Sequence, residues 1–229
     1  MTEQPKEERG ITAIAVSGFK SLRDESRIEI RNLTVLAGAN SSGKSSIMQP
    51  LLLLKQTLEA PYDAGPLKLD GPNVKFTSAE QFLVASPRTS ERLDFISEIE
   101  VNQQRSISNT YTKRSETPKI ELVKTIRHLQ SRIYELRSNM TSDEITRQIP
   151  TGYFRRVFQN EPKGSIPDSN WRVVLKQCFL DAALYNERDN SRFQGAMYNV
   201  KWGISPNIYL THLIHLPGIR GNPERAYPT

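Results

Sequence analysis

Cysteine is almost absent from this chain of 229 residues. Cys178 stands alone, so no disulfide can form within the chain and a zinc site built on cysteine is disfavoured. The three histidines, His128, His212 and His215, are not spaced like a metal-binding triad. Because chains without disulfides are typical of the reducing cytosol, we expect a cytoplasmic protein.

Long hydrophobic runs are also missing. The longest, such as Leu51–Leu54, fall far short of the roughly 20 residues that cross a bilayer, so we expect no membrane partner. The first ten residues, MTEQPKEERG, lack the apolar segment of a secretory signal and predict a disordered leader over 1–10. With 37% hydrophobic and 24% charged residues, the chain has the composition of an ordinary globular protein.

The first hundred residues alternate between strand and helix patterns. Apolar and β-branched residues predict strands at 11–16, 27–30 and 33–37, and the last is apolar without interruption, as in a strand buried on both faces. The leucine-rich segment 45–58 repeats apolar residues at helical spacing and predicts a helix. A short helix at 78–84 and a strand at 93–101 follow a Pro/Gly-rich linker. This order predicts an α/β fold with a mixed sheet.

Helices dominate the prediction for the second half. Between 118 and 138, apolar residues step by four, three, four and three, which predicts one long helix: Leu122, Ile126, Leu129, Ile133 and Leu136. Shorter helices are predicted at 142–149, capped by Ser142, and at 171–185, with a strand at 208–216. The polar stretch 102–118 fits either an edge strand with a loop or a flexible insertion. We therefore expect a helical insertion over 102–170.

One motif carries chemistry. Residues 38–45, GANSSGKS, match G-x-x-x-x-G-K-[ST], and the strand and helix predicted around them are the context that a phosphate-binding loop requires. Backbone N–H groups of such a loop, and the helix that follows, bind an anion. Lys44 would contact the β- and γ-phosphates, and the Ser45 hydroxyl would coordinate Mg²⁺. The motif predicts ATP and Mg²⁺ as cofactors, bound by Gly38, Asn40, Ser41, Ser42, Gly43, Lys44, Ser45 and Ser46.

The residues around this motif resemble a known family. ITAIAVSGFKSL and RIEIRNLTVLAGANSSGKSSIMQPLLLLK are similar to the N-terminal lobe of ABC-type ATPase heads of the SMC, RecF, RecN and OLD group. GANSSGKSS resembles stand-alone OLD-like (AAA_15-like) ATPases, including anti-phage defence ATPases of the Septu type. Ala39 and Ser41 depart from the common SMC spelling, GPNGSGKS. HLPGIRGNPERAYP, at 215–228, resembles a later loop of the same ATPases.

This resemblance implies a P-loop NTPase lobe at 11–101 that resumes at 171–229. In the family the signature motif and the Walker B carboxylates lie downstream of the later loop, and this sequence contains neither, so we expect a truncated lobe that is inactive alone. The complete protein is expected to hydrolyse ATP with Mg²⁺ in a head-to-head dimer joined through the nucleotide site. Gln81 is a candidate for the family glutamine that contacts Mg²⁺ and the attacking water.

Two functions remain open from the sequence. The first is an ATPase that couples nucleic-acid sensing to an effector nuclease in anti-phage defence or DNA repair. The alternative is a protein-interaction module that binds ATP without hydrolysing it. The segment 105–156 holds eleven Lys and Arg against five Asp and Glu, an excess equal to the +6 net charge of the whole chain. It is either a solvated surface or a nucleic-acid surface with Arg155, Arg156, Lys124 and Arg127 as contacts.

Overall fold

The computed structural model describes residues 10–40, 42–85, 94–102, 105–113, 119–149, 169–186, 198–199 and 207–216. Six strands form one sheet in the order β2-β1-β3-β4-β5-β6, and three further strands form a second, smaller sheet in the order β7-β8-β9. The strands of the large sheet are β1 (Ile11–Ser17), β2 (Ser26–Glu29), β3 (Phe95–Val101), β4 (Arg105–Lys113), β5 (Ile120–Leu129) and β6 (Arg132–Arg137). The small sheet contains β7 (Ser169–Lys176), β8 (Phe179–Asn186) and β9 (Tyr198–Asn199). The helices are α1 (Gln49–Leu58), the 3₁₀ turn η1 (Ala79–Gln81), α2 (Ser142–Gln148) and α4 (Asn207–Thr211).

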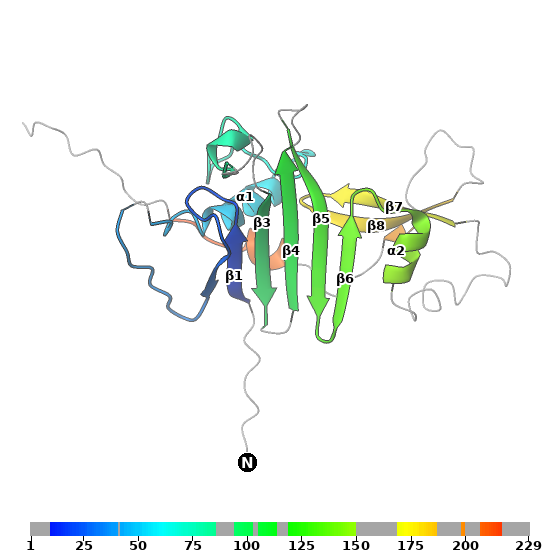
Figure 1. Ribbon diagram of the computed structural model, residues 1–229, viewed down its shortest axis with the longest axis horizontal. Coiled ribbons are helices and arrows are strands. Elements are labelled where there is room, and N and C mark those ends of the chain that lie inside the picture. The colour runs from blue at the N-terminus through cyan, green and yellow to red at the C-terminus, as the bar shows by residue number, and fades with distance from the viewer. Residues whose placement is uncertain are drawn as a thin grey trace, which may run out of the picture.

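One side of the large sheet carries the core. Helix α1 and strands β7 and β8 lie behind this sheet, whereas no helix crosses its front (Figure 1). Ile14 and Val16 of β1 and Ile99 of β3 point to the covered side and pack with the leucines of α1. Helices and sheets therefore combine in the described part, as the α/β class requires. Every pair that joins two described strands is antiparallel, so the parallel pairs of a mixed sheet do not occur in this part of the chain.

Most of the N-terminal predictions agree with the structure, with the exception of the strand predicted at 33–37. Strands β1, β2 and β3 form at 11–17, 26–29 and 95–101, and α1 begins at Gln49, a few residues later than predicted. The short helix predicted at 78–84 is the 3₁₀ turn η1. Phe19, which follows β1, is fully buried among Phe76, Phe82 and Phe95, with ring centroids between 5.0 and 6.2 Å away. This aromatic cluster fixes the turn after β1 against the sheet.

The long helix predicted at 118–138 is wrong, because this segment is the β5–β6 hairpin. Gln130, at φ +55°, lies in the turn, and Leu129 pairs directly with Arg132. Strand β5 also carries β-branched residues that favour extended backbone. The apolar residues with heptad spacing therefore do not share one helix face, because they lie on two strands and on both faces of the sheet. Because β4 pairs with both β3 and β5, residues 105–137 continue the N-terminal sheet, and the expectation of a helical insertion over 102–170 is wrong for these residues. The helix predicted at 142–149 does form, as α2.

Two further predictions in the C-terminal part are wrong. The helix predicted at 171–185 is the β7–β8 hairpin, which turns at Gln177, φ +55°. The strand predicted at 208–216 begins instead as the short helix α4, which contacts α1 through a bond of 3.0 Å from Lys55 Nζ to the Thr211 carbonyl. In both segments the apolar spacing fits either element, and tertiary packing decides between them.

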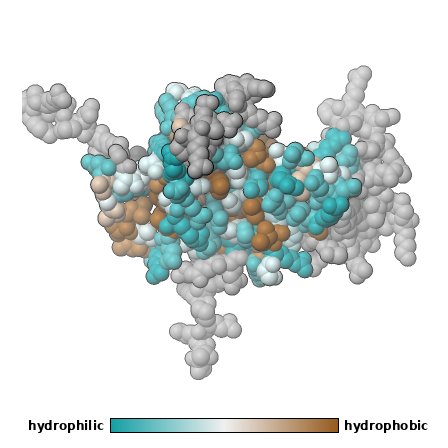
Figure 2. Space-filling view, in the orientation of Figure 1, coloured by the Kyte–Doolittle hydropathy of each residue, from teal (hydrophilic) through white to brown (hydrophobic). Residues whose placement is uncertain are grey.

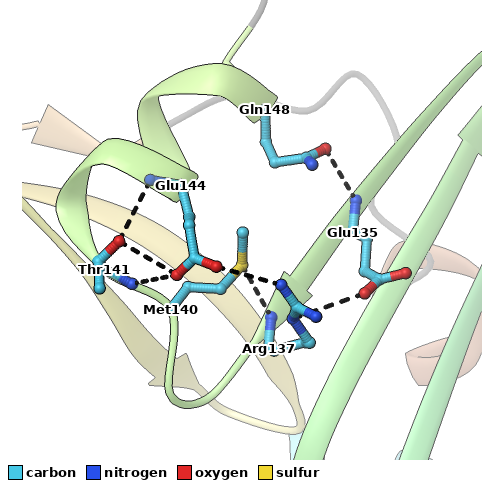
Figure 3. Close-up of polar contacts among 6 residues, drawn as sticks. All are labelled: Glu135, Arg137, Met140, Thr141, Glu144 and Gln148. Atoms are coloured by element: carbon cyan, nitrogen blue, oxygen red, sulfur yellow. Dashed lines mark hydrogen bonds and ion pairs between the residues drawn. The ribbon is translucent and has the colours of Figure 1, made fainter.

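Helix α2 lies beside β6, the edge strand of the large sheet. Thr141 caps it, one residue before the predicted cap, in a reciprocal capping box with Glu144 (Figure 3). Arg137 of β6 bonds Glu144, and the Gln148 side chain accepts a hydrogen bond of 3.2 Å from the Glu135 backbone N–H. One backbone N–H of the edge strand is thereby bonded by a side chain of α2. None of the helices in the described ranges is long and apolar enough to cross a membrane.

Candidate functional site: a phosphate-binding loop

Residues 38–46 form a loop between β2 and α1, and a turn after β1 supports it. In that turn, Phe19 and Leu22 exchange backbone hydrogen bonds of 3.0 and 2.9 Å. The Lys20 backbone N–H donates to the Phe82 carbonyl, which ties the turn to the aromatic cluster. Phe19, Lys20 and Ser21 belong to the family-like segment ITAIAVSGFKSL. In the structure they form the turn against which the loop lies, and this turn is one wall of the site. Ser41 lies outside the described residues.

Gly43 makes the closest approach to this wall. Its φ is +94°, a conformation that side chains with a Cβ rarely adopt. A Cβ at Gly43 would lie 2.7 Å from Cδ2 of Leu22 and 3.1 Å from Oγ of Ser21. Gly38, at φ +154°, is similarly restricted, because a Cβ there would lie 2.9 Å from Oγ of Ser42. The two glycines of the motif are thus favoured mainly by backbone conformation, and a Cβ at either position would also displace a neighbouring side chain.

Lys44 crosses the loop. Its Nζ donates hydrogen bonds of 2.8 Å to the Gly38 carbonyl and 2.6 Å to the Ala39 carbonyl. The ammonium therefore lies at the centre of the loop, held by neutral acceptors that a charged phosphate can replace. The loop also contains a bond of 3.3 Å from the Ser42 backbone N–H to the Ala39 carbonyl.

A cavity of about 470 Å³ opens beside the loop. Its lining combines the loop, the supporting turn and the start of α1: Lys20, Ser21, Asn40, Ser42, Gly43, Lys44, Ser45, Ser46 and Gln49. Burial lowers the pKa of the Lys20 ammonium, whose Nζ also lies 4.7 Å from the centre of the Phe76 ring. Two cationic side chains and several hydroxyls thus face one volume, and none of these lining residues carries a negative charge.

The comparisons with known proteins agree with this geometry. A family model described as an AAA ATPase domain matches residues 10–171, well over half of the chain. The chain belongs to the AAA ATPase domain family. No curated protein and no solved structure matches the chain significantly. Membership of this family supports the prediction, made from the motif and the resemblance, that the chain is a P-loop ATPase domain that binds nucleotide.

The residues of this AAA ATPase domain fit a magnesium nucleotide. The Ser45 hydroxyl is an oxygen ligand of the kind Mg²⁺ prefers, and Mg²⁺ in nucleotide sites takes few protein ligands because phosphates and water complete its shell. The described residues contain no group of three or more Asp, Glu, His or Cys that could hold a metal by itself. The Oε1 atom of Gln49, in the cavity wall, is buried and accepts no hydrogen bond from the described chain. The sequence search missed Gln49, although its place four residues after Ser45 is visible in the sequence.

The strand predicted immediately before the loop is wrong. Residues 33–37 form no strand, and Leu33 and Val35 are 82% and 77% exposed. No described strand pairs with this segment, so its apolar side chains are not covered. Figure 2 shows hydrophobic patches on the side where the chain between β2 and α1 runs, and further patches along the middle of an otherwise mostly hydrophilic front surface. The AAA ATPase domain thus presents apolar surface next to its nucleotide loop.

Gln81 does not line the loop cavity. Its Oε1 accepts a hydrogen bond of 2.9 Å from the Thr77 backbone N–H within the turn around η1. Next to it, Glu80 forms an ion pair of 2.7 Å with Lys113, and that hydrogen-bonded ammonium lowers the pKa of Glu80 to about 2. The described geometry therefore gives Gln81 a local structural contact, and its role at the metal stays a prediction.

The predicted nucleic-acid residues separate in the structure. Arg127 is 4% exposed, and its guanidinium donates a hydrogen bond of 2.8 Å to the Leu180 carbonyl, so it is not available as a surface contact. Lys124 is partly exposed and points to the opposite side of β5. Arg155 and Arg156 lie outside the described residues, as do residues 217–228 of the second family-like segment.

Proposed function

We propose that this AAA ATPase domain binds Mg-ATP at the 38–46 loop and, in the complete protein, hydrolyses it in a head-to-head dimer. The observation that carries the proposal is the loop itself. Gly38 and Gly43 hold backbone conformations that bring the chain close around an anion, and Lys44 points across that loop.

Binding of the phosphates follows from these contacts. The Lys44 ammonium exchanges two neutral carbonyls for charged phosphate oxygens, and hydrogen bonds to charged groups are stronger than those to neutral groups. The Ser45 hydroxyl lies in the same cavity and would hold the metal, which neutralises phosphate charge when bound. Lys20 also lines the cavity and adds a second positive charge near it.

Two observations support completion of the site by another part of the protein or by a partner subunit. None of the cavity-lining residues is Asp or Glu, so a carboxylate that orients the attacking water would come from outside this lining. Leu33, Val35 and Leu36 also expose apolar surface beside the loop, as expected of a segment that a second lobe covers.

The test is nucleotide binding by Lys44 and Ser45 variants. Lys44→Ala should weaken Mg-ATP binding at least tenfold, because each charge-assisted contact is worth about 1.5–3 kcal/mol. Ser45→Ala should mainly reduce the gain in affinity that Mg²⁺ gives. Lys75→Ala, a change of an exposed lysine outside the cavity, is the matched control and should bind as the unchanged protein does. Equal affinity of Lys44→Ala and Lys75→Ala would contradict the proposed function.

Turnover separates this function from the alternative of an ATP-dependent interaction module. We expect the 229-residue chain to release phosphate very slowly, since loss of general-base assistance typically costs about 10²–10⁴-fold. A full-length dimer that hydrolyses ATP supports the ATPase, and tight binding without turnover in that dimer supports the module.

We further propose that the ATPase is coupled to nucleic-acid sensing or to an effector nuclease, in anti-phage defence or DNA repair. The support is the positive charge of segment 105–156, of which Lys124, Arg155 and Arg156 remain candidate contacts. Binding to duplex DNA should weaken with salt at a log–log slope near −0.9 per neutralised phosphate, and Arg155→Glu with Arg156→Glu should abolish it. Failure to bind single- or double-stranded DNA or RNA at low salt would instead favour a protein partner.

A further inference from the structure

Gln49 lies in the wall of the nucleotide cavity, and its side chain carries a hydrogen-bond acceptor that meets no donor among the described residues. It is the first residue of α1 and part of the cavity wall, and its Oε1 atom is buried without a donor among the described residues. A buried carbonyl oxygen that accepts no hydrogen bond costs free energy, and native proteins keep few of them. The Oε1 atom is covered in the ligand-free structure, so a rotation of the Gln49 side chain into the cavity would let it meet a donor that arrives with the ligand.

The helical geometry directs this side chain towards the metal ligand. The Ile47 backbone N–H donates to the Gly43 carbonyl at 3.0 Å, so the i to i+4 pattern of a helix already begins within the loop. Gln49 follows Ser45 by four residues, which places both on one face of that turn. Long side chains on a helix point back towards its N-terminus, so the side chain of Gln49 can reach the cavity next to Ser45.

The chemistry of the ligand then selects the donor. Phosphate oxygens carry no hydrogen at the pH of the cell interior and cannot donate to a carbonyl oxygen. Water bound to Mg²⁺ directs its hydrogens outward and is a strong donor. We propose that Gln49 is a positioning residue that accepts a hydrogen bond from a water of the Mg²⁺ held by Ser45. This inference rests on the proposed function, since it requires Mg-ATP at the loop.

The experiment compares binding with and without the metal in Gln49→Leu and Gln49→Glu. Affinities for ATP and for inorganic tripolyphosphate are measured by calorimetry, once with Mg²⁺ and once with EDTA. Gln49→Leu should reduce the gain in affinity from Mg²⁺ about five- to tenfold for both ligands, and should leave binding in EDTA unchanged. Gln49→Glu keeps the acceptor and adds negative charge, so it should preserve or increase the gain from Mg²⁺ while weakening binding in EDTA.

Stability without ligand gives an independent readout. Replacing an unsatisfied buried acceptor by an apolar side chain of similar size is neutral or stabilising. The melting temperature of ligand-free Gln49→Leu should therefore be equal to or higher than that of the unchanged protein, although its response to Mg²⁺ is weaker. A residue needed only for the structure of α1 would show a lower melting temperature and equal losses of binding with and without Mg²⁺.

The possible failures are distinct. If the unchanged protein gains no affinity for ATP from Mg²⁺, the proposed function is refuted. If it does gain affinity and Gln49→Leu gains equally, the inference about Gln49 alone is wrong. A loss seen with ATP but absent with tripolyphosphate would also overturn the inference, because the donor would then belong to the sugar or base.

Discussion

A substitution at Gly43 should destabilise the protein in two ways, through the backbone conformation of the loop and through a close contact with Leu22. Gly43→Ala forces a Cβ into φ +94°, and a residue with a Cβ in a left-handed conformation costs about 1–2 kcal/mol. The added methyl would also lie 2.7 Å from Cδ2 of Leu22, so that side chain must shift. We expect the free energy of unfolding to fall by about 2–3 kcal/mol in total, within the range of strained sites and overpacked contacts.

A matched control isolates the conformational part. Gly65 has φ +73°, but a Cβ there would meet nothing within 4 Å. Gly65→Ala should therefore cost about 1–2 kcal/mol, the conformational part alone. The contact part is measured by adding Leu22→Ala to Gly43→Ala, since removal of the Leu22 side chain removes the clash. The double variant should be more stable than the sum of the single changes predicts, by about 1 kcal/mol.

The assay is urea unfolding of the complete chain without ligand, followed by ATP binding. Gly43→Ala should also weaken ATP binding, whereas Gly65→Ala should not, because Gly65 does not line the cavity. Additivity of Gly43→Ala and Leu22→Ala within about 0.5 kcal/mol would show that the two residues do not touch. Unchanged stability and ATP affinity in Gly43→Ala would refute the loop geometry as a whole.

Two further predictions concern stability away from the loop. Thr141→Ala removes the cap of α2 and should lower the free energy of unfolding by about 1 kcal/mol, with Thr146→Ala, on the same helix, as the control that should cost less. Chemical denaturation checks both, and equal costs would exclude a capping role for Thr141. Hydrogen bonds from Lys113, from Ser78 and from the backbone lower the pKa of Glu80 from 4.5 to about 2 in the folded protein, so the stabilisation by the charged carboxylate is present above pH 4.5 and is lost as the pH falls towards 2. Unfolding curves of the unchanged protein and of Glu80→Gln should therefore converge in that window, and curves that stay equally separated down to pH 2 would refute the ion pair's contribution.

The parts of the fold that sequence predicted well have patterns that only one element satisfies. Strand β1 is a run of β-branched and small apolar residues, with Ile14 and Val16 on the covered face. The segment of helix α1 is rich in leucine, glutamine and lysine, which favour a helix, and Thr57 is its single β-branched residue. The phosphate-binding loop was predictable for a different reason, because its residue types follow directly from phosphate chemistry.

The parts that failed depend on long-range contacts. In the segment 118–138, the spacing of apolar residues fits a helix as well as it fits a hairpin, and only pairing of β5 with β4 selects the hairpin. The sequence also could not show that the Gln49 side chain lacks a hydrogen-bond donor, because this depends on which groups the fold brings next to it. The same limit applies to residues 33–37, where an apolar run predicts a buried strand but the structure provides no neighbouring strand.

The buried polar side chains behind β4 and β5 show why charge counting overestimated the basic surface. Thr125 donates to the Asn109 side chain at 2.8 Å and accepts from the Leu180 backbone N–H at 3.1 Å, which joins the large sheet to β8. Arg127 belongs to the same junction. Burial lowers its pKa to about 10, against the opposing effect of Asp181, so it keeps its charge at neutral pH inside the protein. Its positive charge therefore holds two sheets together rather than attracting phosphate backbones. A nucleic-acid surface on this segment must consequently rely on the other face of β5, where Lys124 lies, and on the arginines after α2.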